Sequence, residues 1–391
     1  MTAVIVDAVR TPVGAGKSTG ALADVHPVDL LATVLRTLIT RSDLDPALVD
    51  DVIGGCVSQA SEQAMNVTRN AVLGAGFPVS VPATTVDRQC GSSQQAIHFA
   101  AQGVMAGVYD VVIACGVESM SRVPMFSNIA GADNQGAQLA ARYPGGLIPQ
   151  GISAELISQK WGLTREELDA FAYRSHRRAA ATAATSGFAG EMTAVDTPRG
   201  GLTADETIRP GTTMETLAGL RPAFADPHWE TRFGPLDWKV TPGNSSPLTD
   251  GASAVLIMSE RRAQALGLRP RARFRSFAVV GDDPLLMLTG VIPATRQALD
   301  RASLTVDDID IFEVNEAFAP VPLVWQRELR VDPDIVNPRG GAIALGHALG
   351  STGTRLLTSL LSGLEQTGGR LGLQTVCEGG GMANAMVIEL L

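Results

Sequence analysis

Cysteine, aromatic residues and clustered positive charge are all scarce in this chain of 391 residues. The four cysteines lie far apart and form no Cys-x-x-Cys pair, which excludes a disulfide framework and a zinc knuckle, and we expect no metal site. The net charge is −9 and Lys and Arg form no runs, so nucleic acid is not an expected partner. Because no run of 18 strictly apolar residues occurs, we expect no membrane partner either.

Glycine, in contrast, is abundant, with 41 residues, which indicates many tight turns and close backbone approaches. Hydrophobic residues make up 45% and charged residues 18%, an ordinary globular balance. At about 150 residues per domain the length predicts two to three domains. The few cysteines and the lack of a signal-peptide core before Asp7 predict a chain that works in the cytoplasm.

Short runs rich in Val and Ile alternate with longer helical stretches, a pattern that favours a mainly parallel sheet covered by helices. The expected strands are residues 3–6, 52–53, 111–114, 254–258, 309–314 and 386–391. Between residues 119 and 248 the pattern gives way to clusters of Gly and Pro, which indicates an inserted, loop-rich domain. One helix is expected there, because Thr164 and Glu167 form a capping-box signature.

The two ends of the chain resemble each other. Residues 50–54 resemble 307–311, residues 86–91 resemble 336–341, and residues 250–257 resemble 380–388. The repeats suggest a duplicated α/β unit with an insertion in its first copy. We expect a first half at 1–118, completed by 249–265, an inserted domain at 119–248, and a second half at 266–391.

Cys90 lies where a predicted strand leads into a predicted helix. At a helix N-terminus the unpaired N–H groups and the dipole favour a thiolate, so this position predicts a pKa lowered from about 8.5 toward neutral. Such a thiolate would be a nucleophile, although a buried structural thiol is the alternative. The expected apolar face of the helix consists of Ile97, Ala100, Ala101, Val104 and Val108.

Three further segments carry side chains suited to chemistry. His347 lies in a glycine-rich approach to a leucine-rich helix, where it could accept the proton of a cysteine. Cys377 ends a predicted strand over 371–376 beside glycines whose N–H groups could stabilise an oxyanion; an inert thiol is the alternative. Asn315 and Glu316 lie where a strand gives way to a helix, and could instead form a helix cap.

Together these segments resemble the thiolase family of acyl-CoA acetyltransferases, over essentially the whole chain. The resemblance rests on residues 10–12, 88–91, 115–120, 243–251, 315–318, 340–353 and 377–379. It implies the α/β thiolase fold, in which two βαβαβαββ halves form an α/β/α/β/α core and the inserted domain binds CoA. It also implies a homodimer or a homotetramer.

The resemblance implies a reaction through an acyl-cysteine. Cys90 would attack the 3-keto carbon of a 3-ketoacyl-CoA while His347 accepts its proton, and Cys377 would protonate the enolate of acetyl-CoA. One oxyanion hole would be His347 Nε2 with a water held by Asn315; the other would be the N–H groups of Cys90 and Gly379. CoA is then a co-substrate, and no cofactor stays bound.

The resemblance also implies a CoA and acyl site. Arg221 would lie near the CoA nucleotide and Ser246 near the pantetheine amide. Met287 and Phe318 would line the acyl pocket.

Four positions depart from the usual family pattern. Ala348 stands where a Pro is usual, Ser93 where a Gly is frequent, and Gln150 where many members carry a Met against the thioester. Glu378 adds a carboxyl group between Cys377 and the following glycine, and we expect it to face solvent.

The segments around Cys90 and Cys377 favour a degradative 3-ketoacyl-CoA thiolase over a dedicated acetoacetyl-CoA synthase. A catalytically silent, lipid-binding relative would not need Cys90, His347, Asn315 and Cys377 together. A ketosynthase acting on carrier-bound chains would usually lack the second cysteine.

Overall fold

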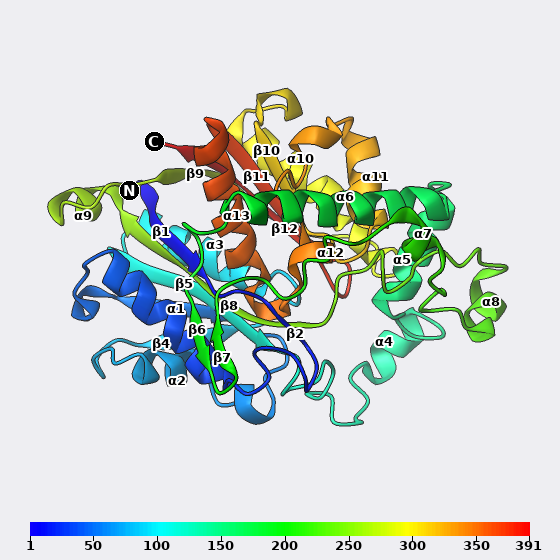
Figure 1. Cartoon of the computed structure of the whole chain (residues 1–391), viewed down its shortest axis with the longest axis horizontal. Coiled ribbons are helices and arrows are strands. Elements are labelled where there is room, and N and C mark those ends of the chain that lie inside the picture. The colour runs from blue at the N-terminus through cyan, green and yellow to red at the C-terminus, as the bar shows by residue number, and fades with distance from the viewer.

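The computed structural model describes residues 1–391 and has one large sheet at its centre (Figure 1). The strand order is β10-β11-β12-β9-β1-β8-β5-β3-β4, with β2 paired to β8. The strands are β1 (Ala3–Arg10), β2 (Gly14–Ala15), β3 (Asp51–Gly55), β4 (Ala83–Val86), β5 (Val111–Ser119), β8 (Thr249–Ser259), β9 (Ala272–Gly281), β10 (Ile311–Val314), β11 (Leu371–Glu378) and β12 (Met382–Leu390). All six expected strands are confirmed, as are the strands expected before Cys90 (β4) and over 371–376 (β11), whereas β2 and β9 are additional.

The sheet consists of two halves of the same topology, as the internal repeats predicted. The first half runs β4-β3-β5-β8-β1, and the second runs β10-β11-β12-β9 with an isolated bridge at Val336 in the place of β4. The duplicated fold is therefore confirmed. The expectation of a mainly parallel sheet is wrong, because only the pairs β3–β4, β3–β5 and β10–β11 are parallel. Each half ends in antiparallel strands, and β11 and β12 are joined by a short glycine turn.

Helices lie in three layers around the two halves, so the predicted α/β/α/β/α layering is confirmed (Figure 1). Helices α1 (Pro27–Arg41) and α2 (Val67–Gly74) cover the outer face of the first half, and α10 (Val291–Ala302), with α11 (Pro320–Leu329) beside it, covers that of the second. Helices α3 (Ser92–Met105) and α13 (Thr352–Thr367) pack on each other between the halves.

Alternating side chains of the strands explain why both faces of the sheet are covered. On β1, Val4, Val6 and Val9 belong to the apolar cluster that includes α1, whereas Ala3 and Ile5 belong to the cluster formed by α3 and α13. Strands buried on both faces must read as nearly continuous apolar runs. This is the pattern from which the strands were predicted.

The two central helices bury the faces expected of them, with one exception. The leucines of α13 are fully buried, and so are Ile97, Ala100, Ala101 and Val104 of α3. Val108 does not belong to this face, because α3 ends at Met105 and the Val108 side chain is 70% exposed.

The inserted segment, residues 119–248, lies across one side of this core and carries most of the irregular chain. Its elements are α4 (Gly136–Arg142), α5 (Gln150–Lys160), α6 (Arg165–Ala184), β6 (Val195–Thr197), β7 (Gly200–Leu202), α7 (Met214–Ala218) and α8 (Pro227–Phe233). The predicted capping box of Thr164 and Glu167 is present at the start of α6. The remaining helices are α9 (Glu260–Ala265) and α12 (Ala342–Leu345). None of the helices is both long and apolar enough to span a membrane.

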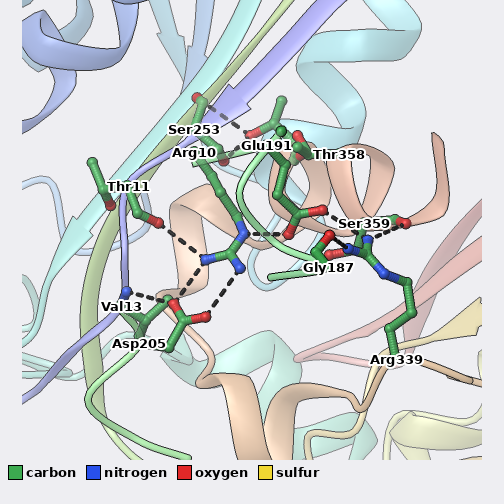
Figure 2. Close-up of polar contacts among 12 residues, drawn as sticks. Arg10, Thr11, Val13, Gly187, Glu191, Asp205, Ser253, Arg339, Thr358 and Ser359 are labelled. Atoms are coloured by element: carbon green, nitrogen blue, oxygen red, sulfur yellow. Dashed lines mark hydrogen bonds and ion pairs between the residues drawn. The ribbon is translucent and has the colours of Figure 1, made fainter. Parts of the chain in front are cut away.

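Buried ion pairs fasten the inserted segment to the core (Figure 2). Glu191 accepts from Arg10 Nε and from Arg339 Nη1, each at 2.7 Å, and Asp205 accepts from Arg10 Nη1 at 2.7 Å. Both guanidinium groups also face the Phe188 ring, at 5.1 and 4.9 Å from its centroid. Burial alone would raise the pKa of Glu191, but the two cations hold it below its ordinary value.

Candidate active site

Cys90 lies in a tight turn between β4 and α3, two residues before the helix begins. Gln89, directly before it, has a positive φ of 48°, which is uncommon for a residue with a side chain. The Ser92 hydroxyl holds the turn, because it accepts from Arg88 N at 2.9 Å and donates to Gln89 O at 2.6 Å. The turn therefore fixes the Cys90 sulfur at the N-terminus of α3, as predicted.

The prediction of a lowered Cys90 pKa is wrong. The residue is 3% exposed, and burial raises the pKa of its thiol to about 12. Hydrogen bonding from the Gln150 amide and from the N–H groups of Cys90 and Gly379 lowers the pKa, but does not offset the burial. Cys90 is therefore a thiol at neutral pH and needs a base to become a nucleophile.

His347 lies in the loop between α12 and α13. The preceding Gly346 has a φ of 81°, and a side-chain carbon placed there would come within 2.5 Å of Thr249. The backbone N–H of His347 donates to Thr249 Oγ1 at 2.9 Å. Burial, with the charge of Arg355, lowers the pKa of His347 to about 3, so the ring is neutral at pH 7 and can accept a proton.

Thr352 decides which ring nitrogen of His347 carries the proton. Its Oγ1 lies 2.7 Å from His347 Nδ1 and 2.9 Å from the carbonyl oxygen of Ala348. A hydroxyl has one proton to donate, and a carbonyl can only accept. The geometry favours a Thr352 hydroxyl that donates to Ala348 O and accepts from His347 Nδ1–H, which leaves the lone pair on Nε2. The ring therefore presents Nε2 as its basic atom.

Asn315 faces that basic atom. It directly follows β10, and its Nδ2 lies 3.3 Å from His347 Nε2. Its backbone N–H donates to Thr375 O at 3.0 Å, which ties it to β11 near Cys377. Its Oδ1 is buried and hydrogen-bonds to no other protein atom, so it is free to accept a bond from a bound molecule.

The second cysteine, Cys377, lies near the end of β11 and is fully buried. Burial raises its pKa well above the ordinary value, and Cys90 raises it further whenever the Cys90 sulfur is ionised. It is thus a thiol that holds its proton, as predicted. Gly379 begins the turn to β12, and its N–H is close enough to the Cys90 sulfur to lower the Cys90 pKa.

Glu378 points inward, so the expectation that it faces solvent is wrong. It is fully buried, and a side-chain carbon placed on Gly91 would lie 2.0 Å from its Oε1. Burial raises the pKa of Glu378 to about 8, and its oxygens hydrogen-bond to no protein atom. Its side chain therefore lies against the turn of Cys90 and is mainly protonated at neutral pH.

Apolar contacts bring these segments together around Cys90. Its buried cluster includes Leu349, two residues after His347, and Val376, directly before Cys377. Four segments from both halves of the chain therefore converge on one buried site. The other two cysteines, Cys56 and Cys115, are also buried but belong to the outer cluster that includes α1.

Two departures from the family pattern find a structural explanation. Ala348 has a φ of −67°, the angle that a proline ring would fix, so the loop keeps its shape without proline. Ser93 Oγ accepts from Thr354 N at 3.1 Å and links the starts of α3 and α13 beside the site.

Glu118, at the end of β5, holds the loops around the site in a way that the sequence reasoning missed. This buried carboxylate accepts from the N–H groups of Val57, Ser58 and Gly350 at 2.9, 3.0 and 2.8 Å. It therefore ties the loop after β3 to the loop of His347. A carboxylate within the apolar run of β5 was the available signal, because a buried charge needs several partners.

Of the expected CoA and acyl residues, Ser246 and Phe318 are neighbours in the structure, because Ser246 N and Oγ donate to Ala317 O at 3.0 and 3.1 Å. Phe318 packs against the core cluster to which Met287 belongs. Arg221 is exposed, and its side chain makes no hydrogen bond or ion pair within the chain.

Comparisons with known proteins identify the family of the chain. The family models for the thiolase N-terminal and C-terminal domains match residues 3–261 and 268–390. The steroid 3-ketoacyl-CoA thiolase FadA6 of Mycobacterium tuberculosis is 48% identical over 100% of this chain and 94% of its own. A 3-ketoacyl-CoA thiolase of Erwinia tasmaniensis is 46% identical over 99% of this chain and 98% of its own.

Among solved structures, an acetyl-CoA acetyltransferase of Bacillus anthracis superposes with a TM-score of 0.89 at 37% identity, over 100% of this chain and 99% of its own. Fold and site thus define an acyltransferase that carries paired thiols. The chain belongs to the thiolase family, so the predicted family, fold and enzyme class are confirmed.

Proposed function

We propose that this thiolase cleaves 3-ketoacyl-CoA thioesters by CoA-dependent thiolysis, with Cys90 as the carrier of the acyl group. The proposal rests on the convergence of Cys90, Cys377 and the His347–Asn315 pair in one buried site. The names of the two curated relatives support the same substrate class. They do not favour a dedicated acetoacetyl-CoA synthase or a silent lipid-binding protein.

The first half-reaction transfers the acyl group to Cys90. The Cys90 proton moves to His347 Nε2, and the sulfur attacks the 3-keto carbon of the substrate. The oxygen of that carbon takes up the negative charge and accepts hydrogen bonds from the N–H groups of Cys90 and Gly379. When the carbonyl re-forms, the bond between C2 and C3 breaks and its electron pair stays on C2, as the enolate of acetyl-CoA.

The enolate is then protonated. His347 Nε2–H and a water held by the free Oδ1 of Asn315 stabilise the enolate oxygen, and Cys377 donates its proton to C2. Acetyl-CoA leaves, and the thiol of a second CoA gives its proton to the Cys377 thiolate and attacks the acyl-Cys90 thioester. The Cys90 sulfur leaves the acyl group and takes back its proton from His347 Nε2. A shortened acyl-CoA leaves, both cysteines are thiols again, and the reverse sequence is a Claisen condensation.

The CoA co-substrate enters along the inserted segment in this proposal. Ser246 contacts the pantetheine amide, Met287 and Phe318 border the acyl chain, and the exposed Arg221 meets the nucleotide. None of these steps requires a permanently bound cofactor.

The domain division, the assembly and the location remain part of the proposal. The halves are residues 1–118 with 249–265 and residues 266–391, and residues 119–248 form the inserted domain that binds CoA. We further propose a cytoplasmic homodimer or homotetramer. Strand β4 supports assembly, because it ends the sheet and leaves one edge open to pairing with a second copy.

The test is turnover of three substrates with free CoA: acetoacetyl-CoA, 3-ketohexadecanoyl-CoA and a bulky, ring-containing 3-ketoacyl-CoA. Loss of the keto thioester is followed by absorbance, and the acyl adduct is located by mass spectrometry. We expect turnover of at least one substrate and an adduct on Cys90. No turnover of any substrate and no adduct would refute the proposal.

Variants of single cysteines separate the two thiol roles. Cys377→Ala should still acquire an acyl group on Cys90 from a simple acyl-CoA, but should lose thiolysis and condensation. Cys115→Ala is the matched control, since Cys115 is an equally buried thiol outside the site. Equal loss of acylation and condensation in Cys377→Ala would contradict the assigned roles.

A further inference from the structure

Gln150 is a polar side chain at the nucleophile that the proposed mechanism does not use. It is the first residue of α5, comes from the inserted segment and is half-buried. Its Nε2 lies 4.0 Å from Cys90 Sγ, within the reach of a hydrogen bond to sulfur. The amide nitrogen can only donate, whereas a thiolate is a strong acceptor.

The Gln150 amide also borders the proposed oxyanion hole. A side-chain carbon placed on Gly379 would lie 3.2 Å from Gln150 Nε2 and 3.3 Å from Gln89 Oε1. Gln150 therefore lies over the glycine whose N–H faces the sulfur, on the side of the inserted segment.

Few groups around Cys90 stabilise its thiolate, so a hydrogen bond from Gln150 would matter for its pKa. Glu378 raises the Cys90 pKa when it is ionised, and no cationic side chain offsets it. Burial also opposes the thiolate, so the neutral donors are the groups that favour it: the Gln150 amide and the N–H groups of Cys90 and Gly379. Gln150 is the only side chain among them.

We propose that Gln150 is a catalytic residue that donates a hydrogen bond from its Nε2 to the Cys90 sulfur whenever that sulfur carries negative charge. The charge is present when the Cys90 proton has moved to His347 Nε2, and again when the acyl group leaves the sulfur for CoA. The amide keeps its own proton in both steps. The inference rests on the proposed role of Cys90 as the nucleophile.

The test is the rate at which iodoacetamide alkylates Cys90, resolved from the other cysteines by peptide mass spectrometry. Below its pKa the reactive thiolate fraction grows tenfold with each pH unit, so a change in pKa appears as a displaced rate line. Methionine has nearly the same size as glutamine but no hydrogen-bond donor. Cys90 should therefore be alkylated about tenfold more slowly in Gln150→Met, which corresponds to a Cys90 pKa higher by one unit. Gln150→Glu keeps the shape, adds negative charge, and should be slower still.

The matched controls are Gln159→Met and Gln159→Glu. Gln159 lies near the other end of α5, is exposed, and donates to Pro235 O at 3.3 Å. Both controls should be alkylated like the wild type. Gln and Glu are nearly isosteric. If Cys90 were alkylated as fast in Gln150→Glu as in the wild type, slower alkylation in Gln150→Met would reflect steric access alone, and the proposal would be overturned. Alkylation of both Gln150 variants within twofold of the wild type would overturn it as well.

This test stands apart from the proposed function. Alkylation reports the state of the Cys90 sulfur whether or not that sulfur carries an acyl group. If Cys90→Ala retained turnover, the nucleophile would be wrong, yet the effect of Gln150 on the sulfur would still be measured. The corresponding loss in turnover should equal the loss in alkylation, since both depend on the thiolate.

Discussion

Replacing Thr352 by valine should slow the acylation of Cys90 without unfolding the site. Valine has the shape of threonine but cannot accept the proton of His347 Nδ1, which now lies 2.7 Å from the Thr352 hydroxyl. The ring is buried, so Nδ1–H would be left without a partner. The ring can avoid this only by moving its proton to Nε2, which removes the lone pair that accepts the Cys90 proton.

The size of the effect follows from the cost of the lost partner. A buried donor without a partner costs about 1–3 kcal/mol. That cost falls on the tautomer that acts as a base, and each 1.36 kcal/mol corresponds to about a tenfold change in rate. Acylation in Thr352→Val should therefore be about 5- to 150-fold slower than in the wild type. Thr352→Ser keeps the hydroxyl and should remain within a fewfold of the wild type.

Two measurements check this reasoning. Rapid-quench mass spectrometry gives the rate at which Cys90 acquires an acyl group, and ¹⁵N NMR of the His347 ring identifies the protonated nitrogen. In the wild type and in Thr352→Ser, Nδ1 should carry the proton, whereas in Thr352→Val it should move to Nε2. Acylation of Thr352→Val within twofold of the wild-type rate would refute this role of the Thr352 hydroxyl. Acylation of Thr352→Ser as slow as that of Thr352→Val would refute it too, because the packing and not the hydroxyl would then matter.

Three further predictions concern stability. Glu191→Gln removes the charge shared by two buried arginines and should lower the free energy of unfolding in urea by about 3–5 kcal/mol; a loss below about 1 kcal/mol would mean that the network contributes little. Ala348→Pro should raise the free energy of unfolding by about 0.4–1 kcal/mol, because the φ of −67° suits proline and the Ala348 N–H donates no hydrogen bond within the chain. A decrease in the free energy of unfolding would show that the proline ring does not fit. Burial raises the pKa of Glu378 from 4.5 to about 8, so the folded protein loses stability as the pH rises through this interval. Glutamine cannot ionise, so Glu378→Gln should melt at a higher temperature than the wild type at about pH 8, with little difference at about pH 5. An equal gain at both pH values would contradict the assigned protonation.

The sequence alone determined the elements and most residues of the candidate site. Strands buried on both faces show as apolar runs, and α13 shows as leucines at helical spacing, because burial dictates these patterns locally. The capping box of Thr164 depends on residues three apart and is equally local. The repeats between the two halves predicted the shared topology, because equal patterns fold into equal units.

The tertiary structure decided the charge and orientation of the groups in the site. The helix N-terminus near Cys90 predicts a lowered pKa, but burial by distant segments outweighs it and raises the pKa to about 12. The sequence predicts that Glu378 is exposed, yet its side chain is buried against Gly91, which is 287 positions away in the chain. Desolvation depends on what every other segment covers, and no local pattern records that.

The same division applies to the four scarce cysteines of the chain. The sequence singled out Cys90 and Cys377 by their turns and glycines, because those features lie within a few residues of each. Only the folded chain brought the two thiols into one buried site, gave His347 a neutral ring with a basic Nε2, and brought Gln150 from the inserted segment to the Cys90 sulfur. Distances between residues far apart in sequence set those properties, and they exist only once both halves have packed around α3 and α13.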